Sequence, residues 1–122
     1  MQHHIGTDII EIKRIRRSIE RYGERFLHKV YTKDELEIYG HLPHALAASF
    51  ASKEAVMKVL GTGARGVAWR EIETLNHPSG KPYIRLNGRA KKVAEKLGIK
   101  EIDISLSHSK EYATAVAIGA VG

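Results

Sequence analysis

The sequence predicts an α+β fold in which a mostly antiparallel sheet packs against one long buried helix. Three observations support this prediction. Both ends of the chain have strand-like patterns, the middle holds an almost uniformly apolar helical segment, and turn residues separate the segments. The length of 122 residues fits one domain, so we expect residues 1–122 to form a single folded unit.

The N-terminal elements are bounded by recognisable start and stop signals. Gly23 is a candidate break in a basic helix. Thr32 and Glu35 form a capping-box pattern that starts a short helix. Pro43 suits the first turn of a long helix, and Gly61 suits its end. The expected elements are a strand over 2–12, a basic helix over 13–29, a short helix from Thr32, and a long helix over about 43–60.

The C-terminal half reads as short strands around one further helix. Pro78, Gly80 and their neighbours predict a turn between two strands, and Asn87 could cap a helix that ends at Gly98. The expected elements are a glycine-rich loop over 61–66, strands near 69–76 and 82–87, a helix over 88–97, and strands over 101–109 and 112–120.

The charge of the chain indicates an anionic partner. Twenty basic and fourteen acidic residues give a net charge of +6, and much of the basic excess lies in residues 13–29. A local basic field of this kind accelerates the association of an acidic partner. Nucleic acid, an anionic metabolite and an acidic protein all satisfy this condition.

The composition excludes several other classes of site. Without cysteine the chain has no disulfide, thiol nucleophile or cysteine-bound metal. No apolar run approaches the ~20 residues of a membrane span, and the N-terminus lacks the apolar segment of a signal peptide. We therefore expect a cytoplasmic protein that does not act on a membrane.

Three charged residues interrupt the apolar helix over 45–60. Glu54 and Lys58 share a helical face with small alanines, whereas Lys53 falls near the apolar stripe. One interpretation is an ordinary Glu54–Lys58 pair at the helix edge, worth about 0.2–0.5 kcal/mol. The other is a binding site, because charges in an apolar helix are costly unless something binds them.

Asp8 is a second misfit, because it lies inside an isoleucine-rich strand. It could occupy a bulge or an exposed face, with Gly6 permitting a bend. Alternatively, a carboxylate on this strand and one on the long helix could together hold Mg²⁺, which favours few carboxylates plus phosphate and water.

Two other segments have both structural and functional interpretations. In the strand over 101–109, His108 shares a face with Leu106, opposite the serine hydroxyls, and a lone histidine there is more often structural. The loop over 61–66 could present free backbone N–H groups to a ligand. Equally well, its glycines could simply end the preceding helix and form a turn. It follows a helix rather than opening one, so it is not a Walker or Rossmann loop.

Four motifs in order resemble the phosphopantetheinyl transferases, specifically the short holo-acyl-carrier-protein synthase group. The similarity runs from about residue 4 to 119. The motifs are IGTDIIEIKRI at 5–15, FASKEA at 50–55 continuing to Lys58 and Gly61-Thr62-Gly63, Gly80-Lys81-Pro82, and SLSHS at 105–109 followed by EYA at 111–113.

The resemblance implies an activity and an assembly. Such proteins are α+β homotrimers with active sites at the subunit interfaces. They move 4′-phosphopantetheine from coenzyme A to a serine of apo-acyl carrier protein, release adenosine 3′,5′-bisphosphate, and support fatty acid biosynthesis.

The resemblance also implies roles for individual residues. Asp8 and Glu54 would bind Mg²⁺ and act in catalysis with Lys58. Residues at the coenzyme A site would be Lys58, Gly61, Thr62, Gly63, Lys81, Pro82 and His108. The acidic carrier protein would face Arg14, Arg21 and Arg25. The base could be Glu54 acting through a metal-bound water, Asp8, or a water alone.

One residue departs from the family pattern. The position before Phe50 is often arginine in the family but is Ser49 here, so a basic contact is either missing or supplied elsewhere.

Two alternative functions stay open at this point. A nucleic-acid-binding module would need aromatic residues among the basic ones, where only Tyr22 and Phe26 occur. The second alternative is a catalytically inactive relative that serves as a trimeric scaffold.

Overall fold

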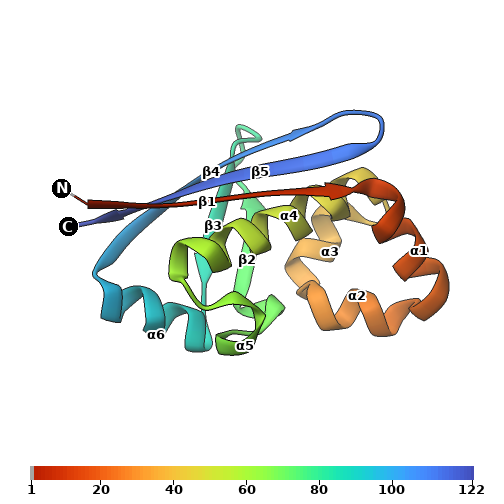
Figure 1. Ribbon diagram of the computed structural model, residues 1–122. Coiled ribbons are helices and arrows are strands. Elements are labelled where there is room, and N and C mark those ends of the chain that lie inside the picture. Colours follow the sequence, from red (N-terminus) through yellow and green to blue (C-terminus); the bar gives the residue numbers. More distant parts are fainter. Residues whose placement is uncertain (1) are drawn as a thin grey trace.

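A computed structural model of the protein describes residues 2–122 (Figure 1). The elements are, in chain order, β1 (Gln2–Glu11), α1 (Ile12–Tyr22), α2 (Glu24–Val30), α3 (Lys33–Tyr39), α4 (Pro43–Leu60), α5 (Gly63–Gly66), a 3₁₀ turn (Trp69–Glu71), β2 (Ile72–Asn76), β3 (Pro82–Leu86), α6 (Gly88–Leu97), β4 (Ile99–His108) and β5 (Tyr112–Val121).

The strands form two antiparallel sheets. The larger sheet has the order β1-β5-β4, so the two ends of the chain lie side by side, and β2 and β3 form a separate hairpin (Figure 1). In the larger sheet Asp8 of β1 and Leu106 of β4 both pair with Ala115 of the central strand. Asp8 therefore lies on the same face as Leu106, Gly6 and Ile10.

Helix α4 covers that face of the sheet, and small residues line both sides of the contact. Ala47, Ala51 and Ala55 of the helix are fully buried. The alanines that β5 turns inward are also buried; they are Ala113, Ala115 and Ala117. Because alanine is small, helix and sheet approach closely, and the charges at the edge of α4 come near β1.

The structure confirms the predicted α+β class, the antiparallel strands and the long buried helix. Helix α4 ends at Gly61 in the left-handed conformation (φ 72°), and a break at Gly23 separates α1 from α2. Thr32 and Glu35 form the predicted capping box of α3.

Two local predictions were wrong. Residues 69–71 form a 3₁₀ turn rather than the start of a strand, and residues 63–66 form one short helix inside the predicted loop. Asn87 occupies the N-cap position of α6 without a capping hydrogen bond from its side chain. Within residues 2–122, no helix combines the length and the apolar character needed to cross a membrane.

Candidate active site

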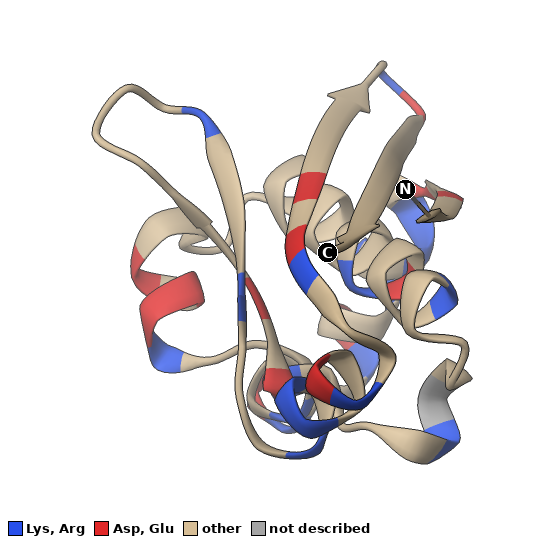
Figure 2. Ribbon diagram, turned by 90° about the vertical axis from the view of Figure 1, so that its left-hand side faces the viewer, with Lys and Arg blue, Asp and Glu red and all other residues tan. Residues whose placement is uncertain are grey.

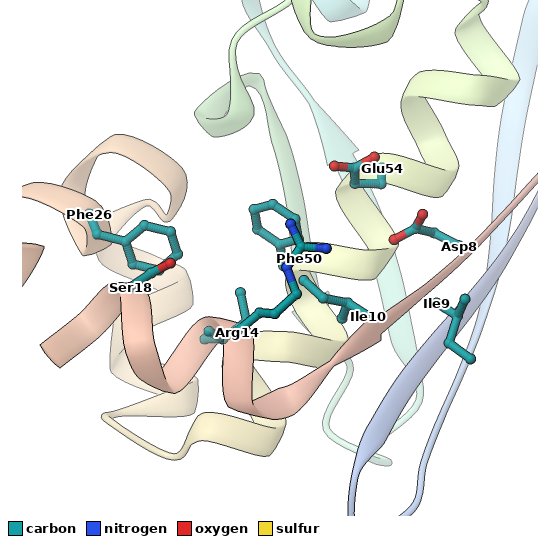
Figure 3. A pocket seen from close by; sticks show the side chains of 9 residues that line it. Asp8, Ile9, Ile10, Arg14, Ser18, Phe26, Phe50 and Glu54 are labelled. Atoms are coloured by element: carbon teal, nitrogen blue, oxygen red, sulfur yellow. The ribbon is translucent and has the colours of Figure 1, made fainter. Parts of the chain in front are cut away.

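Asp8 and Glu54 meet at the edge of the contact between β1 and α4. Both line a pocket of about 240 Å³, together with Arg14 of α1. Figure 3 shows the two carboxylates directed toward the same space from their two elements. Alternation along β1 turns both Asp8 and Ile10 toward α4. Asp8 therefore lies on the face of β1 that also contributes to the hydrophobic core.

Lys58 supplies a positive charge beside Asp8. Its Nζ donates a hydrogen bond to the Thr7 carbonyl oxygen at 2.7 Å and lies 3.5 Å from Asp8 Oδ1. Asp8 is mostly buried, with 17% of its side chain exposed, whereas 53% of the Lys58 side chain is exposed. Among residues 2–122, the ion pair of Lys58 is therefore with Asp8 rather than with Glu54, and the simple helix-edge pair is not formed.

The protein environment disfavours the ionised form of Glu54. Partial burial raises the pKa of this carboxyl, and the negative charge of Asp8 raises it further. Lys58 and Arg14 oppose the rise in pKa. The two acids are therefore close enough to repel each other, and a bound cation would relieve that repulsion.

Asp8 does not occupy a bulge. The pairing of β1 with β5 is continuous from Gln2 to Glu11, and Asp8 is on the face covered by α4. Gly6 therefore does not serve a bend in the strand.

Most of the other residues that line the pocket are apolar, and several belong to the basic helices α1 and α2. Its wall contains Ile15, Phe26 and Phe50, and Arg14 lies at the same opening (Figure 3). Arg14, Arg21 and Arg25 are exposed, as are most other basic residues of α1 and α2. The predicted partner-binding arginines therefore lie on the helices that border the two carboxylates.

The predicted coenzyme A residues are distributed over three places. Gly61, Thr62 and Gly63 follow directly after α4, and the Thr62 hydroxyl is buried with no hydrogen-bond partner among the described residues. Lys81 and Pro82 lie at the turn of the β2–β3 hairpin, which Figure 2 shows standing apart from the three-stranded sheet. None of these five residues lines the Asp8–Glu54 pocket.

His108 lies at the end of β4 and faces α4, as the strand alternation predicts. Its ring stacks on that of His44, with centroids 4.9 Å apart. Both histidines border a second pocket, of about 260 Å³, with Arg16 and Lys110. No sequence pattern marks His44 as a site residue, because its position opposite His108 arises only when the start of α4 meets the end of β4.

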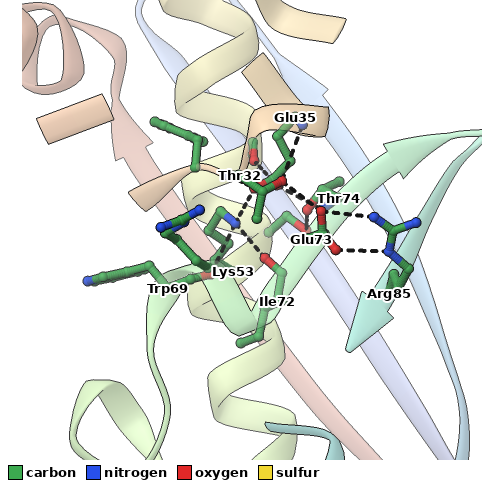
Figure 4. A network of polar contacts seen from close by, with 12 residues as sticks. Thr32, Glu35, Lys53, Trp69, Ile72, Glu73, Thr74 and Arg85 are labelled. Carbon is green, nitrogen blue, oxygen red and sulfur yellow. Dashed lines mark hydrogen bonds and ion pairs between the residues drawn. The ribbon is translucent and has the colours of Figure 1, made fainter. Parts of the chain in front are cut away.

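Lys53 has a structural partner. The hypothesis that the three charges of the helix belong to one binding site is therefore wrong for Lys53. It is completely buried, and its Nζ lies 2.7 Å from Glu35 Oε1 (Figure 4). The Lys53 ammonium also donates to the carbonyl oxygens of Trp69, at 3.1 Å, and Ile72. Burial lowers the pKa of Lys53, while Glu35 favours its charged form.

Glu35 is equally well satisfied, and Ser49 is one of its donors. Its carboxylate accepts hydrogen bonds from the Ser49 hydroxyl at 3.2 Å and from the backbone N–H groups of Thr32 and Thr74 at 3.0 and 2.9 Å. Ser49 is 1% exposed. In this chain position 49 therefore belongs to the interior. The capping-box pattern identified Glu35 but gave no sign of this second role.

Comparison with known proteins shows the family to which the chain belongs. The sequence pattern of the 4′-phosphopantetheinyl transferase superfamily matches residues 4–117. A holo-[acyl-carrier-protein] synthase of Gloeobacter violaceus is 48% identical over 117 residues, which cover 93% of this chain and 89% of the relative. One of Caldanaerobacter subterraneus is 44% identical over 126 aligned positions, covering 100% and 98% of the two chains.

Solved structures share the fold over nearly its whole length. Holo-[acyl-carrier-protein] synthase of Helicobacter pylori in complex with coenzyme A gives a TM-score of 0.87 at 28% identity, with 95% of this chain and 99% of that chain covered. The acyl carrier protein synthase of Plasmodium yoelii with ADP bound gives 0.91 at 33% identity, with 100% and 99% covered. The chain belongs to the 4′-phosphopantetheinyl transferase superfamily, and its relatives are holo-acyl-carrier-protein synthases.

Proposed function

We propose that this protein transfers the 4′-phosphopantetheine group of coenzyme A to a serine of apo-acyl carrier protein, and so supports fatty acid biosynthesis. In this reaction the serine oxygen forms a bond to the β-phosphorus, the pyrophosphate bond breaks, and adenosine 3′,5′-bisphosphate leaves. The observation that carries the proposal is the pair Asp8 and Glu54 beside Lys58, in a chain related to such enzymes along almost its full length.

Asp8 and Glu54 fit a hard cation, and we propose that they hold Mg²⁺. Carboxylate oxygens are ligands that Mg²⁺ prefers, and the mutual repulsion of the two acids favours a positive ion between them. Among residues 2–122 no group of three or more acidic, histidine or cysteine side chains gathers, so phosphate oxygens and water would complete the shell. When bound, Mg²⁺ supplies charge neutralisation at the pyrophosphate and polarises the phosphorus.

The residues of the chain provide the remaining parts of the mechanism. Lys58 places an ammonium next to Asp8, where it would neutralise phosphate oxygens and orient the scissile bond. The nucleophilic serine belongs to the carrier protein, so no serine of this chain needs activation. Among residues 2–122 the buried Thr62 hydroxyl has no hydrogen-bond partner, which supports a ligand contact at the end of α4. His108, Lys81 and Pro82 would contact coenzyme A at more distant points.

The basic surface of α1 and α2 supports docking of an acidic carrier protein. Arg14 borders the pocket of the two carboxylates, and Arg21 and Arg25 continue the positive surface away from it. A carrier protein bound there would bring its serine to the mouth of the pocket. Long-range attraction between the two surfaces would raise the rate of association.

An exposed aliphatic strip on the sheet supports a homotrimer with active sites at its subunit interfaces. The outer face of β1 and β5 exposes Ile5, Ile9, Val116 and Ile118 by 66, 62, 41 and 39%, respectively. Ile5 pairs directly with Ile118, so the strip is continuous across the two strands. Apolar surface of this kind is typical of contact sites between subunits.

We also propose that residues 1–122 form a single domain that works in the cytoplasm, in keeping with a chain free of cysteine.

The test is a direct assay of transfer. The protein is incubated with coenzyme A, Mg²⁺ and apo-acyl carrier protein, and mass spectrometry follows the phosphopantetheine adduct on the carrier serine. We expect Asp8→Asn and Glu54→Gln each to lower kcat by about 10²-fold or more, because each removes one charge that organises the transition state. The matched control, Glu37→Gln at an exposed position of α3, should retain normal kcat.

Two results would contradict the proposal. The absence of an adduct with the unaltered protein and any carrier protein would reject the transferase activity. Near-normal kcat in both Asp8→Asn and Glu54→Gln would reject the two-carboxylate site while leaving the activity itself intact.

A further inference from the structure

Strand β1 touches the backbone of helix α4 at Gly6. A Cβ atom at this position would lie 2.9 Å from the Ala55 carbonyl carbon and would overlap the Ala55 carbonyl oxygen. Real Cβ atoms essentially never approach another heavy atom closer than 3.0 Å. The obstacle is backbone inside a helix, which cannot rotate out of the way as a side chain can. Any larger residue at position 6 therefore forces β1 and α4 apart.

This contact lies among the residues of the proposed active site. Asp8 is two residues from Gly6 on the same strand and the same face, and Glu54 directly precedes Ala55 on α4. The Lys58 Cβ would be only 3.1 Å from an added Cβ at position 6. The distance between the two backbones at Gly6 therefore sets how far the carboxylate from the strand is from the carboxylate of the helix.

We infer that Gly6 is a positioning residue, whose missing side chain sets the β1–α4 separation that cation binding by Asp8 and Glu54 requires. The inference rests on the proposed function, since it assigns a role in the metal site proposed above. Relief of the overlap at Ala55 needs a shift on the order of an ångström. Bound Mg²⁺ tolerates only about 0.2 Å of variation in its ligand distances, so such a shift disrupts the site before it unfolds the protein.

Gly119 provides a matched control. It lies on β5 and also closes against α4, where an added Cβ would be 2.7 Å from Val59 Cγ1. This obstacle is a side chain, and Gly119 pairs with His4 and Ile102 rather than with the strand positions next to Asp8. Gly119→Ala therefore perturbs the same interface between helix and sheet at a distance from the carboxylates.

The experiment measures Mn²⁺ binding to the full chain by calorimetry in the presence of coenzyme A, with thermal unfolding recorded in parallel. We expect Gly6→Ala to weaken Mn²⁺ affinity by about 10-fold or more, as loss of a supporting contact around a metal site does, and Gly119→Ala to change it by less than about 2-fold. Equal Mn²⁺ affinity in Gly6→Ala and the unaltered protein, or an equal loss in Gly119→Ala, would overturn the inference.

A rescue experiment separates positioning from general stability. Glutamate at position 8 adds one methylene, which lengthens the reach of the carboxylate when β1 has moved away from α4. Asp8→Glu should weaken Mn²⁺ binding in the unaltered background but strengthen it in the Gly6→Ala background. Additive losses in the double variant would overturn the inference, because two substitutions that act on one distance must be coupled.

Two further controls keep the test decisive. If Gly6→Ala does not fold, Ala117→Val widens the same layer from the adjacent strand, because Ala117 is buried and pairs with Gly6. Unchanged Mn²⁺ affinity in a folded Ala117→Val variant would then overturn the inference. If the unaltered protein binds no Mn²⁺ with coenzyme A, the two-carboxylate site itself is rejected, and with it the role of Gly6.

Discussion

Lys53 and Glu54 are neighbours in the sequence, but their charges lie in different surroundings. The Lys53 ammonium is fully enclosed and pairs with Glu35, whereas Glu54 borders an open pocket with Asp8. All three donors of Lys53 have acceptors, and Glu35 accepts four hydrogen bonds. A charged residue in an apolar helix can thus be a structural anchor or a site residue, and its partner decides which.

The buried pair should matter strongly for stability. Lys53→Met leaves the Glu35 carboxylate buried without a counter-charge, and we expect the free energy of unfolding to fall by about 3–5 kcal/mol. Adding Glu35→Gln should recover part of the loss, since no uncompensated charge then stays buried. Chemical denaturation of the two variants measures both effects.

Lys58→Met is the matched control on the same helix. Lys58 is exposed, so its removal should change the free energy of unfolding by less than about 1 kcal/mol. An equally small loss in Lys53→Met would show that the Lys53–Glu35 pair does not anchor α4.

At the level of elements, α1 and α4 carry different parts of the proposed activity. Helix α4 holds Glu54 and Lys58, and α1 presents basic residues next to the same pocket. The break at Gly23 turns the chain into α2. Helices α1 and α2 thus form one basic surface beside the carboxylates.

Charge reversal on α1 should act on the carrier protein and not on coenzyme A. We expect Arg14→Glu together with Arg21→Glu to raise KM for the carrier protein by about 10-fold and to weaken its dependence on salt, because fewer attractive charges remain. Steady-state kinetics at several ionic strengths, with each substrate varied in turn, measures this. Lys92→Glu at an exposed position of α6 is the control and should leave both KM values unchanged. A rise in KM for coenzyme A alone would refute the docking assignment.

Elements with a strong periodic pattern were predictable, and those decided by local contacts were not. The predicted bounds of the long helix, about 43–60, agree with α4, because proline and glycine mark its ends. The sequence pattern predicts a strand from residue 69, but Ala68 and Glu71 form a turn in which the Glu71 carboxylate accepts a hydrogen bond from the Ala68 N–H. Such a local hydrogen bond leaves no periodic signal in the sequence.

For the whole molecule, the exposed aliphatic strip of β1 and β5 should determine whether subunits assemble into a trimer. We expect the unaltered protein to have three times the mass of the 13.6 kDa chain in solution, and Ile9→Asp to reduce that mass, because a buried carboxylate without a partner is costly. Light scattering after size-exclusion chromatography measures the mass. Ile38→Asp replaces an isoleucine of α3 that is 42% exposed and should leave the mass unchanged. A monomeric unaltered protein would reject the trimer.

Sequence patterns alone predict the class of the fold, the order of its elements, and the residue types of the proposed site. Periodicity, capping signals and the misfit charges Asp8, Glu54 and Lys58 are properties of short segments, so they can be read without coordinates. The folded structure is needed to see that Lys53 and Ser49 belong to the interior, that His44 stacks on His108, and that Gly6 brings β1 against α4. These contacts join residues far apart in the chain, and each depends on which faces of two elements meet.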